Sequence, residues 1–547
     1  MAQSDGINKS DRFAARDVVQ RVQRAWGESP FYQSQLRGPA PDRIFAEPAD
    51  PYTPDKKFAR SFADGRMSLG DEQLECEGEL ARAWDQASLG GNLRKYLQQF
   101  IWMRHLHSLG DDGAKPARAL MRSWLDRYER WSPDAWEPYA TSERLFFLCA
   151  YGTLVLSGGD AMWRSRVLNS MARQTRHLAK SAHRAETEYQ RLMAAMALAI
   201  VGHCLPGCEP CGVRGVEMVR RELRLQILPD GGHVSRNPSR QLAIAVRLST
   251  LLSTLKMRRI AVPGYLEHVA GRISAICQLF RCGDGRLAVF NGGAEDDGKA
   301  LVSLQGAPTD RTEPAILARH AGYQRMGASR DVVLIDVAAK SSQHNDVFQS
   351  AGSLHYSVGR TRIFTNCGGG DFLGADWSTA LRSAAAHCGL SFDGAGLARP
   401  IITKITHRRG EDSHGQLVEF EGLFGGECDL TYMRRLYLAA GGGDLRGLER
   451  LSRGTNVLRE SARIRFHIHP KLRASLARDE RSILLAGQNR EGWRFRATGC
   501  TIQIEKSVYC GKGDGPVASE QIVLIPNPEA VDESGAISVK WAVKRAV

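Results

Sequence analysis

The hydrophobic periodicity of the chain changes near Gly283, and no other sequence feature constrains the fold as strongly. From about 80 to 280, apolar residues recur at helical spacing, and glycine- or proline-bearing turns separate the segments. Helical hairpins repeated in this way form solenoids or closed toroids, whose concave side is a natural binding cleft. The predicted helical segments are Leu93–His107, Lys115–Trp131, Glu143–Leu156, Met162–His183, Tyr189–His203, Val213–Leu228, Gln241–Leu255 and Tyr265–Phe280.

Beyond about residue 318, the apolar runs are short, β-branched and bounded by turn residues, which is typical of an all-β sandwich. Helices first and strands afterwards exclude a parallel α/β sheet. We therefore expect an α+β multidomain chain with a helical lead-in (1–45), a helical domain (46–310) and an antiparallel β-sandwich (311–547). The predicted strands are Val332–Val337, Leu354–Val358, Arg362–Thr365, Leu417–Phe420, Leu436–Leu438, Ile464–Ile468, Ser482–Leu485, Thr501–Ile504 and Gln521–Ile525.

The composition limits which classes of partner and which cellular compartment are expected for the chain. The 547 residues carry a formal net charge of +14, which attracts polyanions such as nucleic acid, an acidic membrane or an acidic polysaccharide. The alternative is general surface charge, because the Lys and Arg residues form no clustered runs. The N-terminus has no apolar signal region, and no apolar run approaches the ~18 residues of a membrane span. Together with twelve scattered cysteines, this predicts a cytoplasmic protein, with the periplasm or cell envelope as the alternative.

A polar turn, Gln226–Ser239, interrupts two amphipathic segments. Gly231 and Gly232 permit backbone angles closed to other residues, and Pro238 suits the first turn of the next helix. The turn also carries His233, an arginine and an asparagine. It is therefore a scaffold for a polar site.

Three further motifs are ambiguous. The CxxxCxxC triplet Cys204–Cys211 has the spacing of an iron–sulfur or zinc site, but it falls in a short turn between helices, so we predict inert thiols. The glycine triplets 368–370 and 441–443 lack the Walker lysine, and we interpret them as turns. His467 and His469 share one face of a strand, where packing is favoured over metal binding.

An ordered set of motifs runs through the helical and the β-rich parts of the chain. The motifs are Trp136–Arg144, Ile227–His233, Gly283–Gly285 with Phe290–Gly292, His320–Arg325, Asn366–Gly368, Ala386-His387 with Phe392–Gly394, Arg465–Pro470 and Glu491–Phe495. As an ordered set they resemble the heparinase II/III-like family over about residues 45 to 545. The resemblance implies an incomplete (α/α) toroid followed by an antiparallel β-sandwich. It also implies a polysaccharide lyase that cleaves uronic-acid polymers such as glycosaminoglycans by β-elimination.

Elimination requires donors that neutralise the substrate carboxylate and a base that removes the neighbouring proton. If the chain is such a lyase, its catalytic residues must be rearranged, with His233 or Tyr189 as the expected base and Arg191 neutralising the carboxylate. The expected substrate-binding residues are Gln190, Arg236, Asn237, Arg240 and His387.

The chain departs from the family pattern at several of these positions. Gln190-Arg191 stands where the family has Asn-His, and Arg240 stands where it has a tyrosine. The first-strand motif, 346–354, has lost its histidines, and of the implied zinc ligands only His387 is retained, with Asn366 replacing an aspartate. We therefore predict no metal and no cofactor.

Three functions stay open at the level of sequence. The first is a lyase acting on an acidic polysaccharide with rearranged catalytic residues. The second is a non-catalytic polysaccharide-binding or cell-envelope assembly protein that kept the cleft. The third, a nucleic-acid-binding protein, is disfavoured because no recognised nucleic-acid module appears. For His233 a structural role in its own turn competes with catalysis, and His387 has the alternative role of capping a strand corner.

Overall fold

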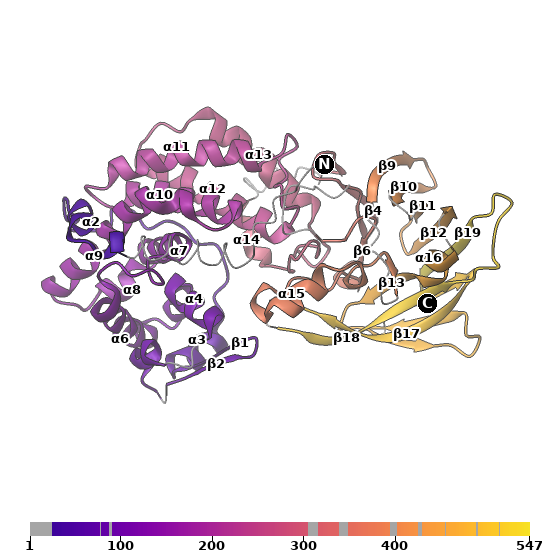
Figure 1. Cartoon of the computed structure of the whole chain (residues 1–547), viewed down its shortest axis with the longest axis horizontal. Helices are drawn as coiled ribbons and strands as arrows, with labels where there is room; N and C mark the ends of the chain where they lie inside the picture. The colour runs from indigo at the N-terminus through magenta and orange to yellow at the C-terminus, as the bar shows by residue number, and fades with distance from the viewer. Residues whose placement is uncertain are drawn as a thin grey trace, which may run out of the picture. The chain divides into compact units, whose positions relative to one another are not determined.

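A computed structural model describes residues 25–76, 78–86, 90–304, 315–338, 348–393, 402–424, 429–453, 456–487, 491–513 and 515–546 (Figure 1). Most of the predicted helical lead-in, residues 1–24, lies outside this set. The chain divides into two compact units. Unit 1 comprises Met1–Gln226 and Arg247–Glu267, and unit 2 comprises Ile227–Val246 and His268–Val547.

The described residues of unit 1 form helices and one short hairpin, β1 (Arg66–Leu69) with β2 (Glu72–Glu75). Helix α12 (Pro238–Met257) and helix α13 (Gly264–Leu279) contribute residues to both units. None of the described helices has both the length and the apolar character needed to cross a membrane. The remaining helices of unit 1 are α2 (Pro30–Gln35), α3 (Lys56–Ala63), η1 (Leu80–Asp85), α4 (Gly91–Gln99), α5 (Trp102–His107), α6 (Asp111–Tyr128), α7 (Pro138–Ala150), α8 (Gly152–Leu156), α9 (Ala161–Ser181), η2 (Ala182–Arg184), α10 (Glu188–Cys204) and α11 (Glu209–Gln226).

Helix α10 forms the core of unit 1, because its residues are buried on all sides from Leu192 to Cys204. It packs closely on α11 through glycines. A Cβ added at Gly202 would lie 2.2 Å from the backbone nitrogen of Gly212, and one added at Gly215 would lie 2.4 Å from the nitrogen of Ala199. Small residues are therefore required where these two backbones meet.

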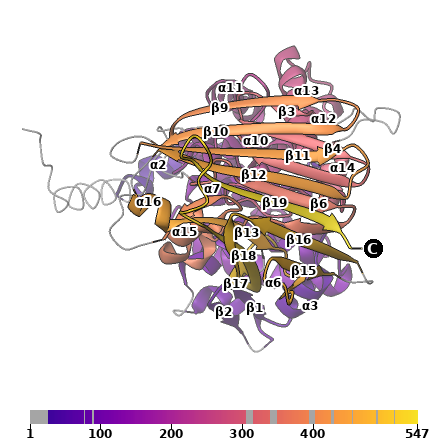
Figure 2. The same cartoon turned by 90° about the vertical axis from the view of Figure 1, so that its right-hand side faces the viewer.

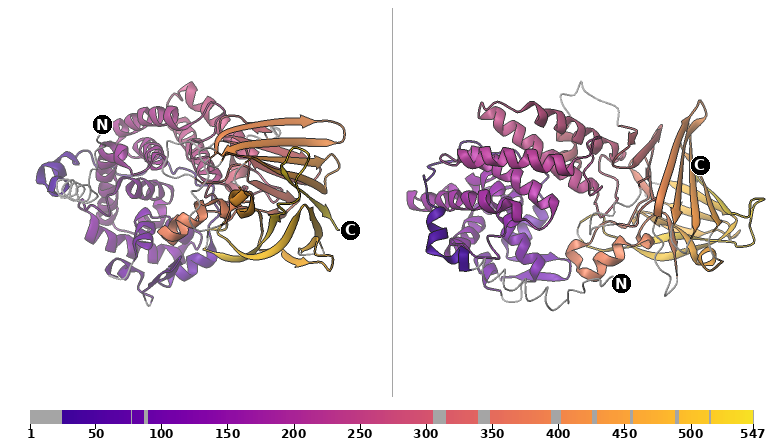
Figure 3. Two further views of the ribbon diagram at one scale, coloured as in Figure 1. Left: turned by 45° about the vertical axis from the view of Figure 1, so that its right-hand side comes forward. Right: turned by 45° about the horizontal axis from the view of Figure 1, so that its top comes forward.

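Unit 2 is built from two antiparallel sheets (Figures 2 and 3). The nine-stranded sheet has the order β17-β18-β13-β7-β6-β5-β4-β3, with β8 paired to β13, and the eight-stranded sheet has the order β14-β15-β16-β19-β12-β11-β10-β9. The predicted fold class, helices followed by an antiparallel β-sandwich, is thus confirmed.

The strands of the nine-stranded sheet are β3 (Leu317–Ala318), β4 (Tyr323–Ala328), β5 (Asp331–Asp336), β6 (Leu354–Val358), β7 (Thr361–Phe364), β8 (Leu390–Phe392), β13 (Ala462–Ile468), β17 (Cys500–Tyr509) and β18 (Val517–Pro526). Those of the eight-stranded sheet are β9 (Ile402–Glu411), β10 (Gly415–Phe424), β11 (Leu430–Ala439), β12 (Asp444–Arg453), β14 (Arg473–Leu476), β15 (Ser482–Ala486), β16 (Gly492–Thr498) and β19 (Ile537–Arg545). Short helices also occur in unit 2: α14 (Gly298–Ser303), η3 (Asp371–Leu373), α15 (Ala375–Arg382), η4 (Ala384–Ala386) and α16 (Asn456–Ser461).

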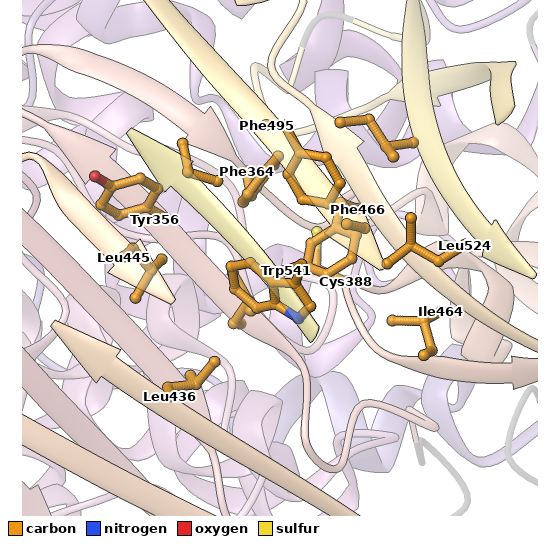
Figure 4. Close-up of a cluster of buried hydrophobic side chains, with 14 of the residues drawn as sticks. Tyr356, Phe364, Cys388, Leu436, Leu445, Ile464, Phe466, Phe495, Leu524 and Trp541 are labelled. Atoms are coloured by element: carbon orange, nitrogen blue, oxygen red, sulfur yellow. The ribbon is translucent and has the colours of Figure 1, made fainter. Parts of the chain in front are cut away.

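The core of unit 2 lies between the two sheets and is rich in aromatic rings (Figure 4). Phe466 of the nine-stranded sheet packs at 4.9 Å, between ring centroids, from Trp541 of the eight-stranded sheet and at 5.4 Å from Phe495. Large apolar side chains contributed by both sheets stabilise a sandwich mainly by the area that they remove from water.

A fully buried ion pair lies within this apolar core. The Arg434 guanidinium lies 3.0 Å from the Glu449 carboxylate, and both side chains are 0% exposed. Tyr432 and Trp541 each donate a hydrogen bond to the same carboxylate, and Arg434 donates to two backbone carbonyls. The pair is thus surrounded by partners that offset much of its desolvation cost.

Candidate functional site

The Gly-Gly-His turn joins α11 to α12, and its backbone is held in place on both sides. Gly231 has φ +94°, and a Cβ added there would lie 2.5 Å from the backbone carbonyl of Arg272. The carboxylate of Asp230 accepts hydrogen bonds from the backbone N–H groups of Gly232, His320 and Ala321. Glycine is therefore required at 231, and Asp230 ties the turn to the loop that precedes β4.

His233 is only 2% exposed and is bonded within its own turn. Its backbone N–H donates to the side chain of Gln241 at 2.7 Å. The backbone N–H of Ser235 donates to Nδ1 at 3.1 Å, so the neutral ring carries its proton on Nε2. The lone pair that a general base would use is already engaged with Ser235.

Arg236 points into unit 2 and bonds the sandwich. Its Nε donates to the carbonyl of Ala321 at 2.7 Å, and its Nη2 contacts the Asp336 carboxylate. The guanidinium carbon lies 4.9 Å from the centre of the Tyr323 ring. Since Asp336 is fully buried, this pair is a structural connection between the turn and strand β5.

Asn237 caps helix α12 and extends the same polar network. Its Oδ1 accepts from the backbone N–H groups of Ser239 and Arg240, and its Nδ2 donates to the carbonyl of Asn291 at 2.9 Å. The Ser350 hydroxyl lies 2.7 Å from Asn291 Oδ1 and also 2.7 Å from Asp336 Oδ2. Residues from five separate stretches of the chain therefore share one buried network, and Arg240 is half-buried beside it.

Three further predicted site residues, Tyr189, Gln190 and Arg191, lie in unit 1, in the first turn of α10. Gln190 and Thr187 form a capping box, in which each side chain accepts from the backbone N–H of the other. The Arg191 guanidinium lies 3.9 Å from carboxylate oxygens of both Glu188 and Glu222. The half-buried Tyr189 ring packs edge-on against another tyrosine. Gln190 thus contributes to the start of the helix, while Arg191 keeps a partly exposed cation.

His387 and His467 are buried in the sandwich and bond different partners. His387 Nδ1 donates to the carbonyl of Ser383 at 2.8 Å, and burial lowers the pKa of His387 to about 4. His467 lies between the Ser507 hydroxyl and the carbonyl of Ala385, and burial lowers its pKa to about 3. Both rings are therefore neutral and serve local packing, which for His387 agrees with the strand-corner role considered above.

The cysteine triplet is distributed over two helices and the turn between them. Cys204 ends α10, Cys208 lies in the turn, and Cys211 lies in the first turn of α11. Burial raises the pKa of Cys208 to about 11 and also raises that of Cys211. Both groups are therefore neutral thiols at physiological pH.

A second buried cluster joins the loop after α13 to the sandwich. The Glu295 carboxylate lies 3.0 Å from His469 Nε2 and accepts a hydrogen bond from the Tyr509 hydroxyl at 2.8 Å. Burial alone would raise the pKa of Glu295, but these bonds and the nearby Arg362 outweigh it and lower the pKa to about 2. The cluster therefore favours an ionised carboxylate.

We expect the Glu295→Gln variant to be less stable than the unaltered protein at neutral pH. Its stability should also depend less on pH in the acid range. A depressed carboxyl pKa contributes stability that is present above the unfolded value of about 4.3 and is lost as pH falls toward 2. Urea midpoints of both proteins between pH 7 and pH 2.5 measure this. If the difference between them stays constant across that range, the ionised Glu295 does not stabilise the fold.

A basic face was not predicted from the sequence. On the eight-stranded sheet, whose strands lie next to one another in Figure 2, one side of β9, β11, β12, β16 and β19 carries nine of the described cations. The residues between them along β11, β12, β16 and β19 are largely buried. The described strands carry three acids on the same side, Glu419, Glu421 and Asp444, and Asp532 before β19 pairs with Arg450 at 2.9 Å. We call this surface the basic face, and its cations are Lys404, Arg408, Arg435, Arg446, Arg450, Arg494, Arg496, Lys540 and Lys544.

A hollow of about 390 Å³ lies in the basic face. Arg435, Arg446, Arg496 and Lys540 line it together with apolar groups that include the Tyr437 ring. The sequence signal for this face is alternation, as in Arg494-x-Arg496, because every second residue of a strand faces the same side. A search for contiguous Lys and Arg runs misses such a pattern.

Comparisons with known proteins agree with this fold. Residues 310–542 match the family model described as "Heparinase II/III-like, C-terminal". The chain is 28% identical over 560 residues to FtsZ-localized protein C of Caulobacter vibrioides, covering 97% of this chain and 95% of that protein. The fold is similar to that of heparinase III (TM-score 0.67, 13% identity, 94% of this chain and 89% of that chain). It is also similar to heparan sulfate lyase HepC from Pedobacter heparinus, as a mutant (TM-score 0.60, 14% identity, 98% and 91%).

Proposed function

We propose that the chain is a non-catalytic member of the heparinase II/III-like family, to which its domain at residues 310–542 belongs. We further propose that it binds an acidic polysaccharide at the cell-division site. The proposal has three supports: the bonding of the turn residues, the basic face of the eight-stranded sheet, and the full-length similarity to a protein whose name places it with FtsZ.

The bonding of the turn favours structure over catalysis. β-Elimination needs a base with an accessible lone pair and donors directed at the substrate carboxylate. Nδ1 of His233 is engaged with Ser235, Arg236 is bonded to Asp336, and Asn237 caps α12. The groups that an elimination would require from these side chains are therefore engaged in stabilising the domain.

The basic face is the observation that carries the binding proposal. Arginine presents a planar fork of donors that pairs with carboxylates, as on the uronic acids of an acidic polysaccharide. The Tyr437 ring in the hollow adds an apolar surface on which the C–H face of a sugar ring can pack. Among the described residues the face has nine cations against three strand acids and Asp532, so its net charge is positive and complementary to such a polymer.

The location of the proposed activity rests on the similarity to FtsZ-localized protein C, which extends over nearly the whole of both chains. We infer that this chain likewise acts with the division machinery, where a cell-envelope polymer is an available acidic ligand. A fluorescent fusion of the chain, imaged together with FtsZ in its host cell, tests this location directly.

The elimination reaction itself is the second candidate, and one observation favours it. Tyr189 and Arg191 are adjacent in the first turn of α10, and both keep part of their surface exposed. A tyrosine base beside a carboxylate-neutralising arginine, with Gln190 as a further donor, is a set of groups that this chemistry can use.

We expect alginate and heparan sulfate to be retained on a column that carries the full-length protein. Neither polymer should develop the ultraviolet absorbance of a C4–C5 double bond. Reversing two charges with Arg496→Glu and Lys540→Glu should weaken polymer binding about tenfold to a hundredfold, because each removes an attraction and adds a repulsion. The matched control is Arg478→Glu, an exposed arginine in the turn between β14 and β15.

Two results would contradict the proposal, and each contradicts a different part. New ultraviolet absorbance that disappears in Tyr189→Phe would establish the lyase instead. Equal polymer retention by the double charge-reversal variant and by Arg478→Glu would exclude the basic face as the binding surface.

A further inference from the structure

A second cavity, of about 510 Å³, lies in unit 2 on the nine-stranded sheet. It is lined by the turn that follows α13, by β4 and by the turn between β6 and β7. The two turns touch, since a Cβ added at Gly283 would lie 2.1 Å from the carbonyl oxygen of Gly359. The cavity wall is therefore built by backbone packing. Its charged or nucleophilic side chains are Arg281, Cys282, Asp284, Arg325 and Arg360.

The charge of this cavity is positive. Its one carboxylate, Asp284, already accepts two hydrogen bonds from Arg362, at 2.8 and 3.1 Å. Among the described parts of the chain, no carboxylate lies within ion-pair distance of Arg281, Arg325 or Arg360. Three guanidinium groups from three different elements thus face the cavity, and the described residues provide no carboxylate counterion for them.

Arg325 is held in a defined orientation. Its Nη1 donates to the carbonyls of Leu279 and Arg281, each at 2.8 Å, where α13 ends. The described residues supply no acceptor for its Nε and Nη2, which form the edge that binds an oxyanion through two parallel hydrogen bonds. Burial lowers the pKa of Arg325, Cys282 opposes this shift, and the nearby Arg281 cation adds to it. An anion in the cavity would stabilise the charged guanidinium.

We propose that this cavity, which we call the arginine cavity, binds a small tetrahedral oxyanion ester, a sugar phosphate or a sugar sulfate. Its volume falls in the range of small-molecule sites, about 300–1,000 Å³, and exceeds what a bare ion requires. Phosphate and sulfate esters share the oxygens that a guanidinium fork recognises. The inference is independent of the proposed function, because the basic face lies on the other sheet and involves different arginines.

Titration calorimetry of the full-length protein with glucose 6-phosphate, glucose 6-sulfate and glucose tests the proposal. We expect heat of binding from one or both esters and none from glucose. Arg325→Gln and Arg360→Ala should each weaken ester binding about tenfold to a hundredfold, as expected for loss of hydrogen bonds to a charged group. The relative affinities of the two esters identify the natural anion as phosphate or sulfate.

Arg360→Ala is the decisive variant, because Arg360 is exposed and its removal leaves the fold intact. Arg478→Ala serves as the control and should bind the ester normally. Both cavity variants should retain acidic polymer like the unaltered protein, whereas the Arg496→Glu, Lys540→Glu variant should bind the ester and lose the polymer. Absence of ester binding, or ester binding unchanged in both cavity variants, would overturn the proposal whatever the polymer result.

Discussion

Replacing Glu449 by alanine should destabilise unit 2 by about 3–5 kcal/mol, as expected when one partner of a fully buried ion pair is removed. The variant leaves the Arg434 cation in the apolar core without a counterion. It also deprives the Tyr432 hydroxyl and the Trp541 indole N–H of their acceptor. Urea unfolding monitored by tryptophan fluorescence measures the loss, and Trp541 reports on the altered site directly.

The neighbouring strands provide a matched control. Glu419 pairs with Arg408 and Arg435, which are 68% and 40% exposed, so Glu419→Ala should cost only about 0–1 kcal/mol. The double variant Arg434→Met, Glu449→Leu should recover part of the loss, because it removes the uncompensated charge but leaves the Tyr432 and Trp541 donors unpaired. A Glu449→Ala variant no less stable than Glu419→Ala would show that the buried pair contributes nothing.

Much of the fold could be predicted from the sequence, because periodicity records which side of an element is buried. The predicted helix 189–203 corresponds to α10 (Glu188–Cys204), and the predicted strand 464–468 lies within β13. Strand β9 and strand β12 escaped prediction. Both carry many charges, and β12 places Glu449 at a buried position where alternation predicts an apolar residue.

The candidate site was harder to predict, because sequence shows where the polar residues are but not what they bond. The turn was located correctly as a polar feature, yet Arg236 bonds Asp336 and Asn237 bonds Asn291, which are 100 and 54 residues away. Such contacts depend on strand pairing that periodicity does not specify. The basic face has the same origin, because its cations come from five strands that only the sheet brings side by side.

We expect Asp336→Ala to destabilise unit 2 by about 3–5 kcal/mol, again because a buried cation loses its counterion. Arg236 would keep its bond to Ala321 but lose the carboxylate, and the Ser350 hydroxyl would lose one of its two partners. Chemical unfolding measures the stability, and hydrogen exchange at residues 231–241 should show faster exchange in the variant.

Arg240→Ala supplies the comparison, because this half-buried arginine lies only four residues after Arg236, in the first turn of α12. It should change stability by less than about 0.5 kcal/mol. Arg236→Ala should resemble Asp336→Ala in stability while both variants, where folded, retain acidic polymer on the basic face. If Arg236→Ala instead abolished polymer binding at unchanged stability, Arg236 would be a ligand-binding residue. The turn would then be part of an active site, as the family resemblance first suggested.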